Sequence, residues 1–192
     1  IDMWERNRDA VAREGTLMHY VFEAFLNHAH VLESLTSSKE FVLFQQYVDS
    51  LAGLEAWRTE WVIFGDEEWL ASTVDFVARD VSGGLVLIDW KRSKELVTRY
   101  SNQFANMHWP FHAFDDCGRM HYRIQLNGYK YILEKYYGYR AVRMFVVCTH
   151  PDNGTQPFVD AVPSMAEEVE GTMQDQRQRV REVRAMRGED TR

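Results

Sequence analysis

The sequence is poor in cysteine, and this scarcity excludes several kinds of site. Only Cys117 and Cys148 occur among the 192 residues. Two cysteines are too few for a four-cysteine zinc site or for an iron–sulfur cluster. They are also too few for the disulfide framework of a small secreted domain. We therefore expect an intracellular, reducing compartment, and the nucleus, the cytoplasm and the mitochondrion all remain open.

Long apolar runs and nucleotide-binding loops are missing as well. No segment approaches the roughly 18 consecutive apolar residues that cross a bilayer, so no membrane association is expected. No signal-peptide pattern, repeat or low-complexity segment is present. The G-x-x-x-x-G-K-S/T loop is absent, so no nucleotide cofactor is expected, and a helicase motor would lie elsewhere. Because the chain starts at Ile1, we interpret residues 1–192 as one domain excised from a longer protein.

Positive charge is also in short supply. The chain has 22 Lys and Arg against 29 Asp and Glu, a formal net charge of −7. This balance weighs against a nucleic-acid binder, because domains that bind phosphate backbones are usually basic. The basic residues are clustered, however, between positions 91 and 99 and between positions 177 and 187. The acidic average therefore leaves room for a local basic surface.

Helical and extended patterns alternate along the chain. Apolar spacing predicts helices over residues 14–35, 39–52, 121–138 and 165–187, with residues 1–14 as a helical extension and 164–192 as the C-terminal helix region. Expected N-terminal signals are Thr16 after a break at Gly15, and capping boxes at Ser37 with Glu40 and at Ser164 with Glu167. Strands are predicted at 57–64, 70–79, 85–91, 143–150 and 158–162. The predicted fold class is α/β, of order ααβββαββα, with a mixed central sheet of about five strands flanked by helices.

Two acids and a lysine stand at the ends of two predicted strands. If the hairpin turn is centred on residue 82, Asp75 and Asp89 face each other with their Cβ atoms about 5 Å apart. Carboxylates so placed share either a proton or a cation. Lys91 lies on the same face as Asp89, two residues on. A metal site is one interpretation, and two solvent-facing acids with a surface ion pair are the other.

Further candidate groups lie on the helices, where simpler interpretations compete with function. His19 and Glu23 share a helix face, and Gln125 and Tyr129 share another. Taken alone, each pair is more typical of packing or of a surface contact. A zinc-protease site needs a second histidine four residues from the first, and none is present.

Taken together, four motifs resemble the PD-(D/E)XK nuclease superfamily, and within it the RecB-like and λ-exonuclease-like branch. They are "GTLMH" (15–19), "STVDFV" (72–77), "IDWK" (88–91) and "QLNGY" (125–129), in that order. Each motif is weak alone, but the resemblance extends from residue 15 to about residue 150. It implies a restriction-endonuclease-like core and a metal-dependent deoxyribonuclease, possible as an exonuclease or an endonuclease.

The resemblance also implies a role for each matching residue. Mg²⁺ or Mn²⁺ would be held by His19, Asp75, Asp89 and the backbone carbonyl of Trp90, and Lys91 would assist the attacking water. Glu60 matches an accessory catalytic acid of some members. Gln125 and Tyr129 would contact nucleic acid or brace the site, and the nucleic-acid contacts would extend to Arg92, Lys94 and Arg123.

The expected partner is single- or double-stranded DNA, together with other domains of a larger replication, repair or mobile-element protein. The aromatic-rich segment 100–114 could stack unpaired bases or form a hydrophobic flap on the sheet. The second hypothesis is a catalytically silent module of the same fold that binds nucleic acid or assembles a complex.

Overall fold

We describe the protein from a computed structural model that covers residues 2–94, 96 and 106–189, with only the backbone for residues 2–4 and 7. The described elements are α1 (Asp2–Leu26), α2 (Glu33–Thr36), α3 (Lys39–Asp49), β1 (Glu55–Gly65), β2 (Leu70–Arg79), β3 (Leu85–Lys91), α4 (Gly118–Tyr136), β4 (Ala141–Cys148), the 3-10 helix η1 (Pro151–Asn153), β5 (Phe158–Ala161) and α5 (Ala166–Met186). The α/β prediction is confirmed. The observed order is αααβββαββα, because the short α2 precedes α3.

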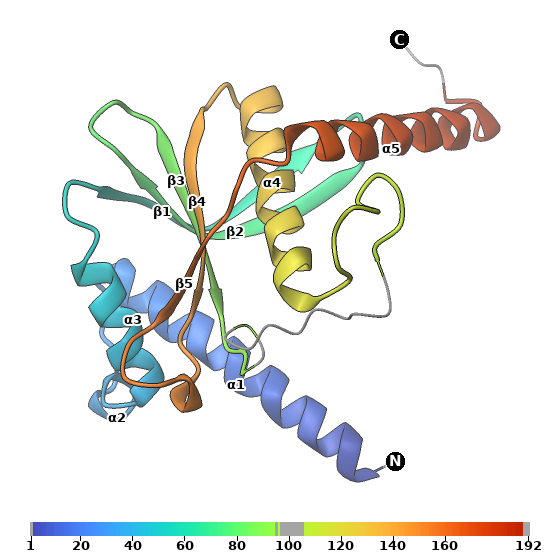
Figure 1. Cartoon of the computed structure of the whole chain (residues 1–192). Coiled ribbons are helices and arrows are strands. Elements are labelled where there is room, and N and C mark those ends of the chain that lie inside the picture. Colours follow the sequence, from blue (N-terminus) through green and yellow to red (C-terminus); the bar gives the residue numbers. More distant parts are fainter. Residues whose placement is uncertain (1, 95, 97–105, 190–192) are drawn as a thin grey trace.

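The five strands form one mixed sheet in which they lie side by side in chain order (Figure 1). β1, β2 and β3 make an antiparallel meander, β3 and β4 run parallel, and β5 returns antiparallel to β4. A parallel pair needs a long crossover, which α4 provides here. The central position of β3 follows from this topology.

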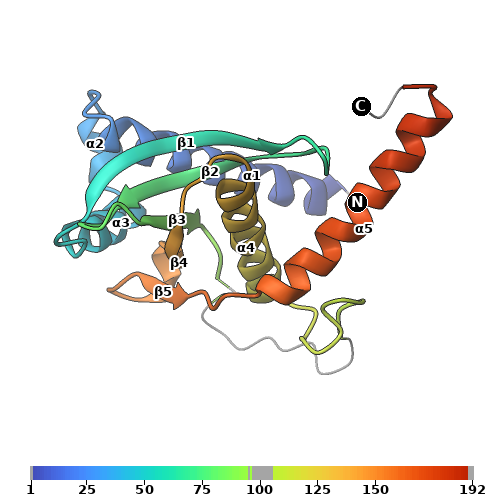
Figure 2. The same cartoon turned by 90° about the horizontal axis from the view of Figure 1, so that it is seen from above.

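Helices cover the two faces of the sheet (Figure 2). One apolar cluster joins α1 and α3 to the sheet, and a second joins α4 to the opposite face. β3 serves both, since Leu85 and Leu87 point toward α4 whereas Ile88 and Trp90 point toward α1 and α3. A strand buried on both faces has a nearly continuous apolar sequence. The acid within that run, Asp89, is therefore forced into the interior, where it is 1% exposed.

The hairpin register predicted from the turn is confirmed. Phe76 pairs with Ile88 and Arg79 with Leu85, so paired numbers sum to 164 as expected. The ladder stops one pair before the two acids, because the Trp90 backbone amide donates to Asp75 Oδ2 at 2.8 Å instead. Asp75 and Asp89 thus lie next to each other at the open end of the ladder.

The first helix differs from the prediction at both ends. α1 runs without a break through Gly15, and Thr16 is no N-cap, since its hydroxyl donates to the Ala12 carbonyl within the helix. An interior glycine costs only about 1 kcal/mol, which the burial of Met18 and Phe22 offsets. The helix also ends at Leu26, about ten residues early.

Both predicted capping boxes are wrong, for two different reasons. α3 is capped by Ser38, one residue later than expected, and its hydroxyl accepts from the Phe41 amide. The N-cap of α5 is Met165 and not Ser164, and the Met165 amide donates to the Asn127 side chain of α4 at 2.8 Å. The first box is therefore shifted by one residue, whereas at α5 a tertiary partner takes part in place of a local cap.

The remaining expectations for the described segments hold closely. α4 ends as predicted, with Gly138 at φ +70° just after it, a conformation that glycine adopts without strain. Cys117 and Cys148 are both free thiols. None of the described helices combines the length and the apolar character needed to span a membrane. The N-terminal half of α1 extends beyond the sheet in Figure 1, and the C-terminal half of α5 does so in both views (Figures 1 and 2).

Candidate metal centre

Three neighbouring strands each present an acid at the same level of the sheet. Thr59 pairs with Phe76 and Trp61 with Val74, which puts Glu60 of β1 opposite Asp75 of β2. Asp75 and Asp89 are the next residues beyond the last β2–β3 pair, Phe76 and Ile88, and the charge of Asp89 acts on Asp75. Directly opposed like charges destabilise a sheet. A row of three carboxylates therefore requires protons, a cation or basic neighbours.

The backbone is strained where the row crosses β1. Glu60 has φ +43°, in the left-handed region that residues other than glycine rarely adopt. In β2, Val74 belongs to the α4 cluster and Phe76 to the α1 cluster, although residues two apart in a regular strand share a face. The alternation of side chains between the two faces of the sheet is therefore interrupted in this hairpin, at the level of Glu60 and Asp75. Such conformations cost about 1–3 kcal/mol and occur often at functional sites.

His19 joins this row from α1. Its Nδ1 lies 3.7 Å from Glu60 Oε1 and 3.6 Å from Asp75 Oδ2. One potential ligand atom from each of His19, Glu60 and Asp75 lies within 4.8 Å of the others. Ligand atoms about 2.1 Å from Mg²⁺ are themselves separated by about 3–4 Å. The three side chains therefore need only small movements to share one divalent ion.

Burial and mutual repulsion alter the protonation of this cluster. Desolvation, and then the charge of Asp89, raise the pKa of Asp75 to about 7 from its ordinary 3.8. Burial disfavours the charged form of His19, but the contact with Glu60 and the charge of Asp75 outweigh it and raise the His19 pKa. A positive charge placed between His19, Glu60 and Asp75 would therefore be stabilised by the two carboxylates.

Asp89 and Lys91 form a buried ion pair beside the cluster. Lys91 Nζ lies 2.6 Å from Asp89 Oδ2. Burial raises the pKa of Asp89, and although burial opposes the charge of Lys91, the carboxylates of Asp89 and Asp75 raise the Lys91 pKa. Lys91 is therefore a fixed ammonium. The predicted meeting of acid and amine on one face of β3 is present.

The buried oxygens of Asp89 are the feature of the site that best suits a bound cation. Neither Oδ1 nor Oδ2 has a hydrogen bond of acceptable geometry among the described residues, even though Oδ2 is close to Lys91. An unsatisfied buried carboxylate is costly. Oxygen ligands are those that Mg²⁺ and Mn²⁺ prefer. The residues present therefore suit a hard divalent ion.

α4 supplies the far wall of the site. Tyr129 is 4% exposed, and its hydroxyl accepts a close hydrogen bond from Gln125. Burial raises the Tyr129 pKa, to which the charge of Asp89 adds. Tyr122 places its ring 4.8 Å from Lys91 Nζ. The position of Tyr129 suits the predicted bracing role, and the sequence analysis missed Tyr122, although positions 122, 125 and 129 share a helix face.

The basic residues that were expected to bind nucleic acid are each paired with acids. Arg92 contacts Glu14 at 2.8 Å and Glu40 at 3.1 Å. Lys94 contacts Asp152 at 2.5 Å, and Arg123 contacts Asp160 at 2.6 Å. The predicted nucleic-acid contacts of Arg92, Lys94 and Arg123 remain untested predictions. Each would require an ion pair to open.

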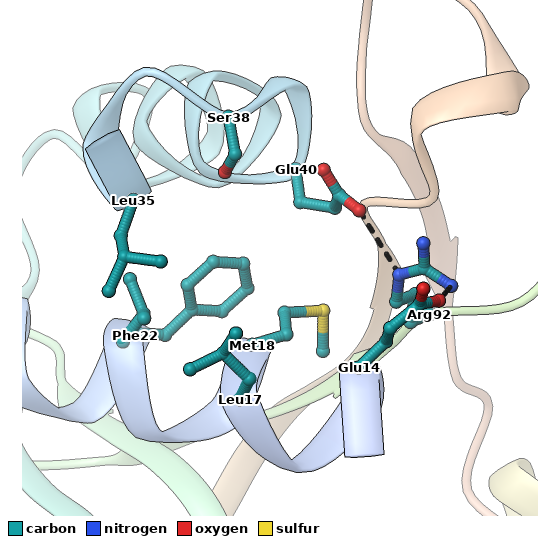
Figure 3. A pocket seen from close by; sticks show the side chains of 9 residues that line it. Glu14, Leu17, Met18, Phe22, Leu35, Ser38, Glu40 and Arg92 are labelled. Atoms are coloured by element: carbon teal, nitrogen blue, oxygen red, sulfur yellow. Dashed lines mark hydrogen bonds and ion pairs between the residues drawn. The ribbon is translucent and has the colours of Figure 1, made fainter. Parts of the chain in front are cut away.

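A pocket of about 160 Å³ lies on the other side of α1 (Figure 3). Its floor is apolar, with Met18, Phe22 and Leu35, and its rim carries Arg92 between Glu14 and Glu40. None of the clustered acids of the sheet lines it. The pocket is therefore separate from the candidate metal centre.

Two other expectations concern the loop before α4 and the second group on α1. Residues 100–105 of the aromatic segment 100–114 lie outside the described residues. In the described part, Phe111 and Phe114 pack with Met165 and Met173 at α5 rather than across the face of the sheet, and the stacking of unpaired bases stays a prediction. Glu23 is not in the three-residue cluster around His19.

The structure thus brings most predicted site residues together, but it groups them differently from the predicted ligand set. His19 and Asp75 are grouped most tightly with Glu60, whereas Asp89 is held by Lys91. The metal ligand set, including the carbonyl of Trp90, stays a prediction. Comparisons with known sequences add no assignment, since neither a protein-family model nor a curated protein matches this chain.

Proposed function

We propose that this protein is a metal-dependent nuclease of the PD-(D/E)XK superfamily, of the RecB-like and λ-exonuclease-like branch. It would hydrolyse phosphodiester bonds of DNA, as an exonuclease or an endonuclease. One observation carries the proposal: acids from three adjacent strands, a histidine from α1 and a buried ammonium converge at one level of the sheet. Four short motifs in the expected order support it.

The proposed division of labour follows from position. His19, Asp75 and Asp89 would hold Mg²⁺ or Mn²⁺, with Glu60 as a further acid, and the ion would supply an acidified water and stabilise developing phosphate charge. Lys91 keeps its proton and can orient water or a phosphate oxygen. From the α4 side, the Tyr122 ring lies 4.8 Å from Lys91 Nζ, and the buried Tyr129 is close enough for the charge of Asp89 to raise its pKa.

A catalytically silent binding or assembly module of the same fold is the second candidate. The observation that favours it is the 2.6 Å contact between Lys91 and Asp89, because an ammonium at that position competes with a divalent ion. Both candidates share the proposed partner, DNA, and the proposed setting, a larger replication, repair or mobile-element protein in a reducing intracellular compartment.

A cleavage assay separates the two candidates. Labelled single- and double-stranded DNA is incubated with wild-type protein, D75N, D89N or K91A, in Mn²⁺ or Mg²⁺ and in a chelator. D49N is the matched control, because Asp49 is an exposed acid at the end of α3 that forms no ion pair with any other residue that the structure describes. We expect cutting by the wild type and D49N to require the metal, and each site variant to lose at least about 100-fold.

The outcomes are distinct. Cutting that survives the chelator, or D89N activity equal to that of D49N, contradicts the nuclease proposal. DNA binding without cutting in either metal favours the silent module.

A further inference from the structure

The turn between β1 and β2 presents a tryptophan in an unfavourable backbone conformation. Trp69 is 42% exposed and has φ +50°. A bulky side chain at positive φ is a true outlier. Strain of this kind persists only where the surroundings determine the conformation. An explanation is needed both for what holds Trp69 and for what its exposed ring could do.

The residue before it provides the anchor. Glu68 is 1% exposed, and its carboxylate accepts hydrogen bonds from Tyr136 at 2.5 Å, Arg177 at 2.8 Å and Lys135 at 3.0 Å. Tyr136 and Lys135 belong to α4 and Arg177 to α5. Gly65 allows the close approach, since a Cβ there would lie 2.9 Å from the Tyr136 ring. The turn is thereby fixed to both helices.

Arg184 of α5 and Arg187, the residue just after α5, lie against the exposed ring. The guanidinium carbon of Arg184 is 5.2 Å from the ring centre of Trp69, and that of Arg187 is 5.7 Å away. Their acidic contacts are long and exposed: Arg184 to Asp66 at 3.8 Å and Arg187 to Glu189 at 3.9 Å. Exposed contacts of this kind are weak. A phosphate could replace either acid at little cost, unlike the acids of the short ion pairs around Arg92, Lys94 and Arg123.

We propose that Trp69, Arg184 and Arg187 form a platform that binds single-stranded nucleic acid. An exposed indole can stack an unpaired base, and two guanidinium groups beside it can contact the flanking phosphates. Arg184 and Arg187 supply the local positive charge that the chain as a whole lacks. The platform extends the proposed function, because it would hold substrate outside the metal centre. Its binding, however, can be measured without any cleavage.

The test measures affinity in the absence of metal. Binding of the full chain to a labelled 20-nucleotide oligothymidylate is followed by fluorescence anisotropy in a chelator, as a function of salt. We expect W69A to weaken binding about tenfold. We expect R184Q/R187Q to weaken it as well and to reduce the slope of log affinity against log salt by about 1.4, since each single-strand phosphate contact contributes about 0.7.

R179Q/R181Q is the matched control. It removes the same charge from the exposed surface of α5, but neither Arg179 nor Arg181 is among the arginines over Trp69. Circular dichroism and thermal melts check that all variants fold. If W69A and R184Q/R187Q bind like the control, the platform is refuted. A blunt duplex that binds as tightly as the single strand, with no effect of W69A, refutes base stacking.

The platform and the nuclease proposal fail separately. Loss of cleavage in D89N with unchanged binding leaves the platform intact. Cleavage by W69A at wild-type affinity refutes the platform and leaves the metal centre intact.

Discussion

Asp75 combines a neighbouring acid on each side with burial. Glu60 and Asp89 lie near it on the two flanking strands, and its pKa of about 7 reflects desolvation first and the charge of Asp89 second. A cation in the cluster would relieve both effects. The carboxylate is therefore the residue at which metal binding and stability are most directly linked.

Added Mn²⁺ should stabilise the folded protein through this residue. A ligand at 100 times its dissociation constant stabilises by about 2.7 kcal/mol, which for a chain of this length raises the melting temperature by about 5–10 °C. Differential scanning fluorimetry measures the shift. D75N should lose most of it and D49N should keep it. No shift in the wild type at 10 mM Mn²⁺ would contradict a metal centre.

The left-handed Glu60 predicts an unusual order of stabilities. Glycine normally destabilises a strand, but at φ +43° it is the residue without strain. We expect E60G to be more stable than E60A by about 1 kcal/mol in urea denaturation. Equal stabilities, or a more stable E60A, would show that the backbone at this position is not strained. Both variants lack the carboxylate of Glu60, so a difference in stability between E60G and E60A reports only the relief of backbone strain.

Among the elements, the β1–β2 hairpin and the last two helices act as one unit. The buried Glu68 at the turn joins Lys135 of α4 to Arg177 of α5. Burial alone would raise the Glu68 pKa, but hydrogen bonds from Tyr136, Arg177 and Lys135 lower it to about 2 from 4.5. The far half of α5 has little other support, since its buried residues are Val169, Met173 and Val180.

Acid should therefore weaken this unit. Because the folded pKa of Glu68 is below the unfolded value, its contribution is fully present above about pH 4.5 and is lost as the pH falls toward 2. The cations around it are partly exposed, so solvent screens part of the effect, and we expect about 2 kcal/mol. Urea denaturation between pH 3 and pH 7 measures it.

E68Q should remove this dependence and lower stability at pH 7 by a similar amount. E67Q is the matched control, because Glu67 also contacts Lys135 at 2.6 Å but is exposed. Little change is expected in E67Q. A pH dependence that persists in E68Q would assign it to other carboxylates.

The whole molecule places two candidate contact regions along one hairpin. Trp69 lies six residues from Asp75, which in an extended strand is about 20 Å. About six stacked nucleotides at 3.4 Å each would cover that length. The acidic net charge of −7 makes such local contacts important, because long-range attraction to DNA is weak.

Substrate length should therefore matter for cleavage. We expect single strands of 12 nucleotides to be cut with a lower KM than strands of four, because only the longer ones reach Trp69 from the metal centre. W69A should abolish this difference and leave kcat unchanged. Steady-state cleavage of a length series measures it. The same length dependence in W69A would place the additional contacts elsewhere.

Local patterns were enough for most elements of this fold and for part of its site. Strand periodicity and the turn at residues 80–84 predicted the register that brings Asp75 to Asp89, and alternation predicted that Lys91 joins them. These features depend on neighbours within one hairpin. The capping box at Ser164 failed because the amide at the start of α5, that of Met165, is satisfied by Asn127, which is distant in the chain.

Long-range packing made the remaining decisions, which no local pattern encodes. It carried α1 unbroken past Gly15, turned Glu60 into the left-handed region beside His19, and neutralised Arg92, Lys94 and Arg123 with acids from other elements. It also fixed Trp69 through Glu68. The physical reason is the same in each case: the energy of a buried charge or a strained residue depends on partners that only the folded chain brings within contact.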